Sequence, residues 1–201
     1  MRNLSFRFYL LKKLNQLDKE IEKRKASGIV DYLALALTTF GVGYIPGAPG
    51  TYGSLLGLGI YLFIGMHLAE AAEHGLSVGT NVAHIVSFHF ALVAVVFAGF
   101  ILLGIWASGR TTAIFGTDDP HEAVVDEVMG QIVTFLFMPF TTDWRLILAG
   151  FVLFRLFDIW KPYPIDDLQM LPKGLGICAD DLVAGVYAGI CLSMIYAIIL
   201  M

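Results

Sequence analysis

Two long stretches without any Asp, Glu, Lys or Arg constrain the fold of this chain more than any other feature. Residues 84–106 and 182–201 contain no Asp, Glu, Lys or Arg. The hydrocarbon core of a bilayer is about 30 Å thick, and a helix rises about 1.5 Å per residue, so about 20 apolar residues cross it. Each stretch is long enough, and both therefore predict membrane-spanning helices.

The overall composition supports a membrane protein. Hydrophobic residues make up 57% of the 201 residues, charged residues only 15%, and the mean hydropathy is +0.74. An ordinary soluble domain is excluded by these values. We predict an all-α, multi-pass bundle in the membrane, with a further span at 54–68 and a hairpin formed by 122–140 and 146–161. A lipid environment is expected, a nucleic-acid partner is not, and the oligomeric state is left open.

The basic residues are concentrated at the N-terminus. Residues 1–28 hold eight of the 13 Lys and Arg and three of the 17 Asp and Glu. They predict a basic amphipathic arm, either on the anionic inner leaflet or in solvent, ahead of one membrane-embedded catalytic domain at 29–201. Under the positive-inside rule the N-terminus is cytoplasmic, and no cleavable signal is visible. The two cysteines, Cys178 and Cys191, are expected to be buried free thiols.

A glycine- and proline-rich stretch interrupts the first apolar segment. Residues 30–40 are too few to cross the bilayer, and the sequence GVGYIPGAPG at 41–50 cannot continue a helix. We predict a broken or re-entrant helix at 30–50 whose loop, 43–54, faces a site. The backbone amides near Gly50, with Thr51 and Ser54, could bind a phosphate group. A plain turn with Thr51 as the helix N-cap is the alternative.

The segment FRLFDIWKPYP at 154–164 places three charged residues in apolar surroundings. On a helix, Arg155, Asp158 and Lys161 share one face, and Pro162 ends the helix just beyond them. Charges in a membrane are costly unless they are paired or bound to a metal. The stripe therefore indicates a functional site.

Further acidic residues occur in two other segments. Pro120 predicts a helix start, on which Glu122 and Asp126 share a face while Glu127 points about 100° away. Asp118 and Asp119, just before it, are expected to face solvent. Asp180 and Asp181 are predicted at the N-terminus of the helix 182–201.

The predicted topology brings these charges to one side of the membrane. Counted from a cytoplasmic N-terminus, Asp126, Asp158, Lys161 and the pair Asp180–Asp181 all fall on the cytoplasmic side. Carboxylate oxygens from separate helices are suitable ligands for Mg²⁺, and Arg155 and Lys161 are suitable for phosphate. A lipid with a phosphorylated headgroup could reach this site laterally.

Four sequence blocks in this order resemble the phosphatidylglycerophosphatase A family of bacterial inner-membrane enzymes. They are PGAPGTYGS, DPHEAVVDEVMGQ, FRLFDIWKPYPI and GLGICADDLVAGV, within residues 30–200. The resemblance implies Mg²⁺-dependent removal of the terminal phosphate of phosphatidylglycerophosphate. It assigns no role to residues 1–28 or 166–173.

Together, the residues and the resemblance predict specific roles. The metal ligands are expected to be Asp126, Glu127, Asp158, Asp180 and Asp181. Arg155, Lys161 and the 46–54 loop, with Gly50, Thr51 and Ser54, are expected to bind phosphate; the catalytic set is Asp126, Asp158, Lys161 and Asp181. Attack by a metal-activated water and an aspartyl-phosphate intermediate both remain open.

Two other function classes also place carboxylates among membrane helices. An ion channel or transporter would do so along a path through the bilayer. Another lipid-headgroup enzyme, such as a CDP-alcohol phosphotransferase, is the second alternative, but its DGxxAR signature is absent from the sequence.

Overall fold

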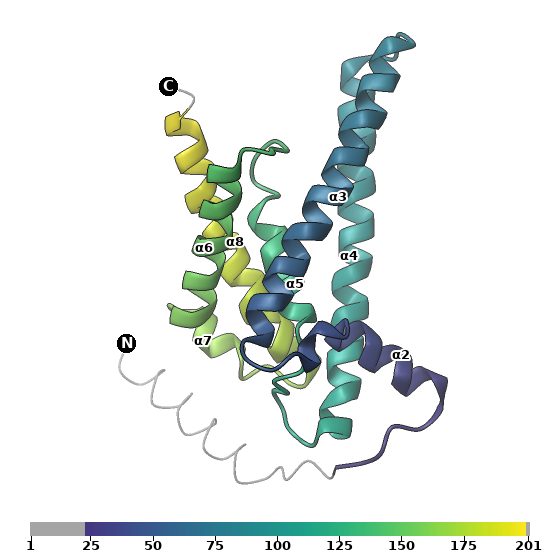
Figure 1. Cartoon of the computed structure of the whole chain (residues 1–201), viewed down its shortest axis with the longest axis vertical. Helices are drawn as coiled ribbons and strands as arrows, with labels where there is room; N and C mark the ends of the chain where they lie inside the picture. Colours follow the sequence, from purple (N-terminus) through teal and green to yellow (C-terminus); the bar gives the residue numbers. More distant parts are fainter. Residues whose placement is uncertain (1–22, 200–201) are drawn as a thin grey trace.

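A computed structural model describes residues 23–199 as a helical bundle (Figure 1). These residues contain no β-strand, which confirms the predicted all-α class. The elements are α2 (Gly28–Thr39), the 3-10 helix η1 (Val42–Tyr44), α3 (Pro49–Ser77), α4 (Val82–Phe115), α5 (Val125–Thr134), α6 (Trp144–Trp160), α7 (Ile165–Leu168) and α8 (Gly174–Ile199). Most of the predicted basic arm at 1–28 lies outside the described residues.

Three helices are long and apolar enough to cross a membrane, namely α3, α4 and α8. They contain the predicted spans 54–68 and 84–106 and the described part, 182–199, of the span 182–201, and each helix begins before its predicted span. Helix α3 continues past His67 and His74 and ends at Ser77. In Figure 1, α3 rises, α4 returns, α6 descends and α8 rises again. Helices α3 and α4 are thus antiparallel, and so are α6 and α8.

The predicted helix at 122–140 is the main correction to the expected elements. Helix α5 covers only Val125–Thr134, so Glu122 lies before the helix and does not share a helical face with Asp126. The segment before α5 is held by α2, because the Val124 amide donates to the carbonyl of Thr38 at 2.9 Å. Beyond α5, residues 135–143 form turns and an extended connection to α6.

The position of the aspartate pair on α8 is a second correction. Because α8 begins at Gly174, Asp180 and Asp181 lie nearly two turns inside the helix, and neither caps its N-terminus. The glycines at 174 and 176, which resemble a turn in the sequence, belong to the first helical turn. Gly174 packs so closely on α4 that a Cβ there would lie 2.0 Å from the Ile105 carbonyl oxygen.

Helix α5 occupies the centre of the bundle and packs on α3, α4, α6 and α8 (Figure 1). Its Val125 and Met129 form one buried cluster with Cys178 of α8. Phe135, at its end, packs with Leu146 and Leu192 in another. These contacts fix the orientation of α5, whose first turn carries Asp126 and Glu127. Both cysteines are free; Cys178 is buried as predicted, and Cys191 is only half-buried.

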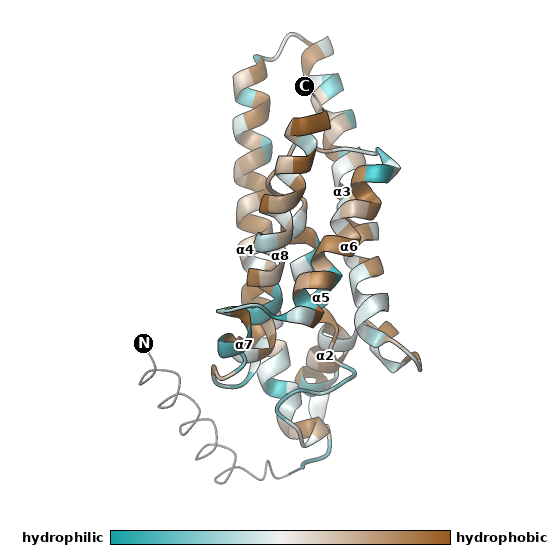
Figure 2. Ribbon diagram, turned by 90° about the vertical axis from the view of Figure 1, so that its left-hand side faces the viewer, coloured by the Kyte–Doolittle hydropathy of each residue, from teal (hydrophilic) through white to brown (hydrophobic). Residues whose placement is uncertain are grey.

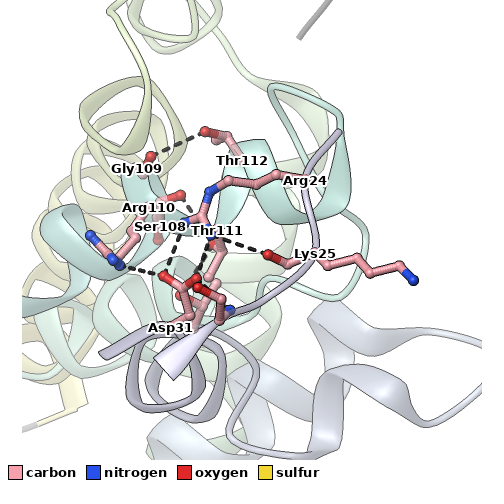
Figure 3. A network of polar contacts seen from close by, with 10 residues as sticks. Arg24, Lys25, Asp31, Ser108, Gly109, Arg110, Thr111 and Thr112 are labelled. Atoms are coloured by element: carbon pink, nitrogen blue, oxygen red, sulfur yellow. Dashed lines mark hydrogen bonds and ion pairs between the residues drawn. The ribbon is translucent and has the colours of Figure 1, made fainter. Parts of the chain in front are cut away.

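An ion cluster attaches α2 to the lower end of α4 (Figure 3). Asp31, which is 1% exposed, accepts hydrogen bonds from Arg24, from the Ser27 amide at 2.9 Å and from Arg110 Nε at 2.7 Å. Hydrogen bonding to Arg24, followed by the Ser27 amide, holds the pKa of Asp31 well below its usual range although burial opposes this. The Arg24 amide also donates to the Ala113 carbonyl.

The opposite face of α2 exposes apolar side chains. Ile29, Tyr32 and Leu33 are 78%, 62% and 59% exposed, whereas Asp31 and Ala34 are buried. Figure 1 shows α2 lying across the lower end of α4, and Figure 2 shows hydrophilic residues gathered in the connections at that end. An amphipathic helix next to basic residues is typical of a membrane–water interface.

Candidate active site

A cavity of about 1060 Å³ lies where α5, α6 and α8 meet their connecting segments. It collects charged side chains that are distant in the sequence. All seven charged positions predicted for the site line it: Asp126, Glu127, Arg155, Asp158, Lys161, Asp180 and Asp181.

Three carboxylates form the centre of the cavity wall. Asp126 and Glu127 come from the first turn of α5, and Asp181 comes from α8. One oxygen from each residue lies within 4.8 Å of the others. Asp126 is 8% exposed and Asp181 3% exposed, so the repulsion between them is poorly screened.

Two cations lie beside the carboxylates and are already paired. Arg155 Nη1 donates to Asp158 Oδ2 at 2.5 Å, and Lys161 Nζ donates to Asp180 Oδ2 at 2.6 Å. Arg155 and Asp158 lie one turn apart on α6, as the sequence predicts. Helix α6 ends at Trp160, and Lys161 follows as its left-handed C-cap with φ 46°. Its side chain therefore reaches across to α8.

The charges of this cluster do not balance. Five carboxylates and two cations leave three formal negative charges: Asp126, Glu127, Asp158, Asp180 and Asp181 against Arg155 and Lys161. Moreover, Asp126 Oδ1, Glu127 Oε2 and Asp180 Oδ1 are buried and have no hydrogen-bond partner in the described chain. Buried carboxylate oxygens need a partner, and a hard divalent cation such as Mg²⁺ takes oxygen ligands of this kind. The residues present therefore fit such a cation.

The predicted 46–54 loop is helical from Pro49, where α3 begins, and the first turn of this helix contributes to the cavity through its backbone. Gly50 lines the cavity together with Ala48 and Pro49. A Cβ at Gly50 would lie 2.4 Å from Glu127 Oε1 and 3.1 Å from Arg155 Nη1, so the close approach requires glycine. Thr51 and Ser54 do not line the cavity. The buried Ser54 hydroxyl donates to the Gly50 carbonyl of its own helix at 2.8 Å and does not face the cavity.

The structure also places residues on the cavity to which the sequence assigned no role. Asp118 and Asp119 are exposed as expected, but they lie on its rim with His121. The segment from Gln169 to Lys173, before α8, forms another part of the wall. Nothing in its composition marks it, because its position depends on where α8 begins.

Gln131 is a further polar residue that the sequence reasoning did not single out. It lies one helical turn beyond Glu127, is fully buried, and neither of its amide atoms has a hydrogen-bond partner within the described residues. Gln131 follows Glu127 by four residues, so on a helix the two side chains share a face. This spacing could have identified Gln131 from the sequence.

Comparisons with known proteins identify relatives of this chain. A family model described as phosphatidylglycerophosphatase A matches residues 35–196. A Haemophilus influenzae protein named phosphatidylglycerophosphatase A is 34% identical over 82% of this chain and 88% of its own length. An Escherichia coli protein of the same name is 40% identical over 43% of this chain and 50% of its own length.

A Bacteroides thetaiotaomicron protein carries a different name, "Putative phosphatidylinositol-3-phosphatase". It is 35% identical over 78% of this chain and 89% of its own length. No solved structure matches the chain. The family match covers all four sequence blocks and every charged residue of the central cluster. The chain belongs to the phosphatidylglycerophosphatase A family, a family of phosphoric monoester hydrolases.

Proposed function

We propose that this protein hydrolyses the terminal phosphomonoester of phosphatidylglycerophosphate, giving phosphatidylglycerol and inorganic phosphate, with Mg²⁺ as cofactor. The observation that carries the proposal is the cluster of carboxylates and paired cations in one cavity. This cluster has three more formal negative charges than positive ones. We further propose that the cavity opens at the cytoplasmic face of a bacterial inner membrane.

The carboxylates are suited to hold the cofactor. Asp126, Glu127 and Asp181 offer oxygens within 4.8 Å of one another, and Asp158 and Asp180 lie on the same cavity. When bound there, Mg²⁺ would offset the negative charge of the phosphate and of the carboxylates.

The cations are suited to hold the substrate phosphate. Arg155 has a planar fork of donors, and Lys161 is a mobile point charge. Phosphate oxygens would compete with Asp158 and Asp180 for these two side chains, which are now paired at 2.5 and 2.6 Å. The absence of a side chain at Gly50 lets the start of α3 lie directly against Glu127 and Arg155 on the cavity wall.

Hydrolysis forms a bond from a water oxygen to phosphorus and breaks the bond from phosphorus to the headgroup oxygen, which takes up a proton. The chain's own contribution is to fix the phosphate against Arg155 and Lys161 and to limit its contact with bulk water. In the alternative route, an aspartate carboxylate would replace water as the nucleophile in the first step. The resulting aspartyl-phosphate would be hydrolysed in a second step, and burst kinetics would reveal it.

The test uses the purified protein in detergent with phosphatidylglycerophosphate, with and without Mg²⁺, scored for inorganic phosphate. We expect release that requires Mg²⁺ and is lost with a chelator. Phosphatidylinositol 3-phosphate serves as the parallel substrate, because one relative carries that name. Absence of Mg²⁺-dependent release from phosphatidylglycerophosphate would refute the proposal. Faster release from phosphatidylinositol 3-phosphate would identify that lipid as the substrate instead.

A further inference from the structure

The proposed substrate carries two phosphate groups, and the central cluster accounts for only one of them. The terminal group is a phosphomonoester, whereas the inner group is a phosphodiester that joins the headgroup to diacylglycerol. The inner phosphate carries one negative charge and must lie near the same cavity. The central carboxylates would repel it, because that cluster already has an excess of negative charge.

The cavity is large enough for both groups. At about 1060 Å³ it slightly exceeds the usual range of about 300–1,000 Å³ for ligand pockets. Its wall extends beyond the central cluster to the segment before α8, from Gln169 to Lys173. A headgroup longer than a single phosphate therefore has a surface to contact.

Lys173 is the remaining cation on this wall. Among residues 23–199, three Lys or Arg side chains line the cavity: Arg155, Lys161 and Lys173. The first two are paired with Asp158 and Asp180. Within the same residues, no carboxylate lies within the 4.0 Å ion-pair distance of the Lys173 ammonium group. Its charge is thus available to a ligand.

The backbone of Lys173 is held firmly although its side chain is exposed. The residue has φ 54°, in the left-handed region, and its carbonyl accepts hydrogen bonds from the amides of Gly176 at 3.0 Å and Ile177 at 3.4 Å. The adjacent Gly174 lies against Ile105 and Gly109 of α4 without room for a side chain. The close crossing of α8 and α4 therefore fixes where the Lys173 side chain starts.

We propose that Lys173 binds the phosphodiester of the lipid substrate and is a specificity-determining residue, selecting headgroups that carry a diester in addition to the terminal phosphomonoester. This inference rests on the proposed function for the identity of the substrate. It assigns Lys173 to substrate binding and not to the reacting phosphorus.

The kinetic test compares Lys173→Ala and Lys173→Arg with the wild type on two substrates in mixed micelles. Short-chain phosphatidylglycerophosphate has the diester, and short-chain phosphatidic acid has a phosphomonoester without it. For Lys173→Ala we expect KM for the first substrate to rise about tenfold with kcat nearly unchanged, and KM for the second to change less than about twofold. Lys173→Arg should restore most of the binding.

Lys25→Ala is the matched control. Lys25 is an exposed lysine at the same end of the molecule, and its side chain points away from the ion cluster in Figure 3. It does not line the cavity. This variant removes the same charge and should leave both KM values at the wild-type level. An unchanged KM in Lys173→Ala, or an equal rise for both substrates, would overturn the proposal.

A binding measurement separates this inference from the proposed activity. Short-chain phosphatidylglycerol has the diester but no phosphomonoester, and its binding can be followed by calorimetry without turnover. We expect its Kd to rise about tenfold in Lys173→Ala and to stay constant in Lys25→Ala. Equal Kd values in the wild type and Lys173→Ala would overturn the subsite, even if phosphate release is confirmed. A rise in Kd would support it, even if phosphate release fails.

Discussion

Asp126 shows how a single residue can serve a site at the expense of stability. Its carboxylate is buried beside Glu127 and Asp181, and its Oδ1 has no hydrogen-bond partner in the described chain. Without a cation, these neighbouring negative charges repel one another at close range. The side chain therefore contributes to folding only when something positive is bound.

We expect Asp126→Asn to have opposite effects on activity and stability. Loss of a proposed metal ligand should lower kcat/KM for phosphate release at least about a hundredfold. Loss of one buried negative charge should raise the midpoint of thermal unfolding measured in detergent with a chelator present.

Asp166→Asn is the control for this comparison. Asp166 is an exposed acid of α7 that does not line the cavity, so neither quantity should change appreciably. Wild-type activity in Asp126→Asn would remove Asp126 from the site. Lower stability without metal would mean that its carboxylate has a favourable partner.

Among the residues of the site, the charged ones could be predicted from the sequence, and the contacts of the neutral ones could not. Arg155, Asp158 and Lys161 are conspicuous because charge among apolar residues requires a reason. The sequence made Ser54 equally suitable as a hydrogen-bond donor to phosphate, but its hydroxyl donates to the Gly50 carbonyl instead. A hydroxyl can bond to its own helix, and no sequence pattern reveals which partner it takes.

At the scale of whole elements, the packing of α3 against α5 depends on a row of glycines. Gly53 and Gly57 face α5, and a Cβ at Gly57 would lie 2.7 Å from the Val128 carbonyl oxygen. Neither backbone can move away without disturbing Glu127, which directly precedes Val128 and whose Cβ would lie 3.3 Å from a Cβ at Gly53. The glycines thus hold Gly50 and Glu127 close together.

Gly57→Ala should separate the two helices and reduce both stability and activity. We expect a loss of about 1–3 kcal/mol in unfolding free energy, measured by denaturant titration in detergent, with reduced phosphate release. Gly59→Ala is a matched control on the same helix, since nothing lies within 4 Å of its Cβ position. That variant should be neutral or slightly more stable, because alanine favours a helix over glycine. Equal effects of the two substitutions would contradict the packing argument.

The attachment of α2 should depend on the charge of Asp31. Because the pKa of Asp31 is lowered in the folded protein, its contribution is complete above the ordinary carboxyl pKa and is lost as the pH falls through the lowered value. At neutral pH, Asp31→Asn should weaken the bonds to Arg24 and Arg110 and make the amides of residues 28–39 exchange several-fold faster with deuterium. Protection equal to that of the wild type would show that other contacts hold α2.

Asp143→Asn provides the comparison for this experiment. Asp143 caps α6, and its ion pair with Arg145 is largely exposed. Its loss should affect amides at the start of α6 and leave those of α2 unchanged.

Helix existence was predictable from the sequence, whereas helix ends were not. The apolar runs at 84–106 and 182–201 identify α4 and α8 because only a helix satisfies the backbone in lipid. Their ends depend on capping residues and on contacts with neighbouring helices. At the start of α4, for example, the Asn81 side chain accepts a hydrogen bond from the Ala83 amide. The sequence suggested a turn at Gly174, but this residue begins α8 and contacts α4. Asp180 and Asp181 therefore lie inside the helix and not at its N-terminus.

At the scale of the whole molecule, the start of α5, the end of α6 and the start of α8, which line the charged cavity, lie toward one end. The tip of the α3–α4 hairpin lies at the other end (Figure 1). The proposed orientation, with the cavity on the cytoplasmic side, places Ser77 near that tip outside and Asp166 of α7 inside. Both residues are exposed.

Single cysteines at these two positions test the orientation. In a background lacking Cys178 and Cys191, a membrane-impermeant maleimide should label Ser77→Cys in intact cells. It should label Asp166→Cys only after the inner membrane is opened. The reverse pattern would place the cavity on the outer side and contradict the proposed localisation.

The exposed apolar face of α2 has a consequence for how the enzyme meets its substrate. If Ile29, Tyr32 and Leu33 rest in the interfacial layer, the level of α2 marks the membrane surface, and the nearby cavity opens among the lipid headgroups. Encounter then takes place in two dimensions, by lateral diffusion. The rate would follow the mole fraction of substrate in the lipid, and diluting it with inert lipid would slow turnover at constant bulk concentration.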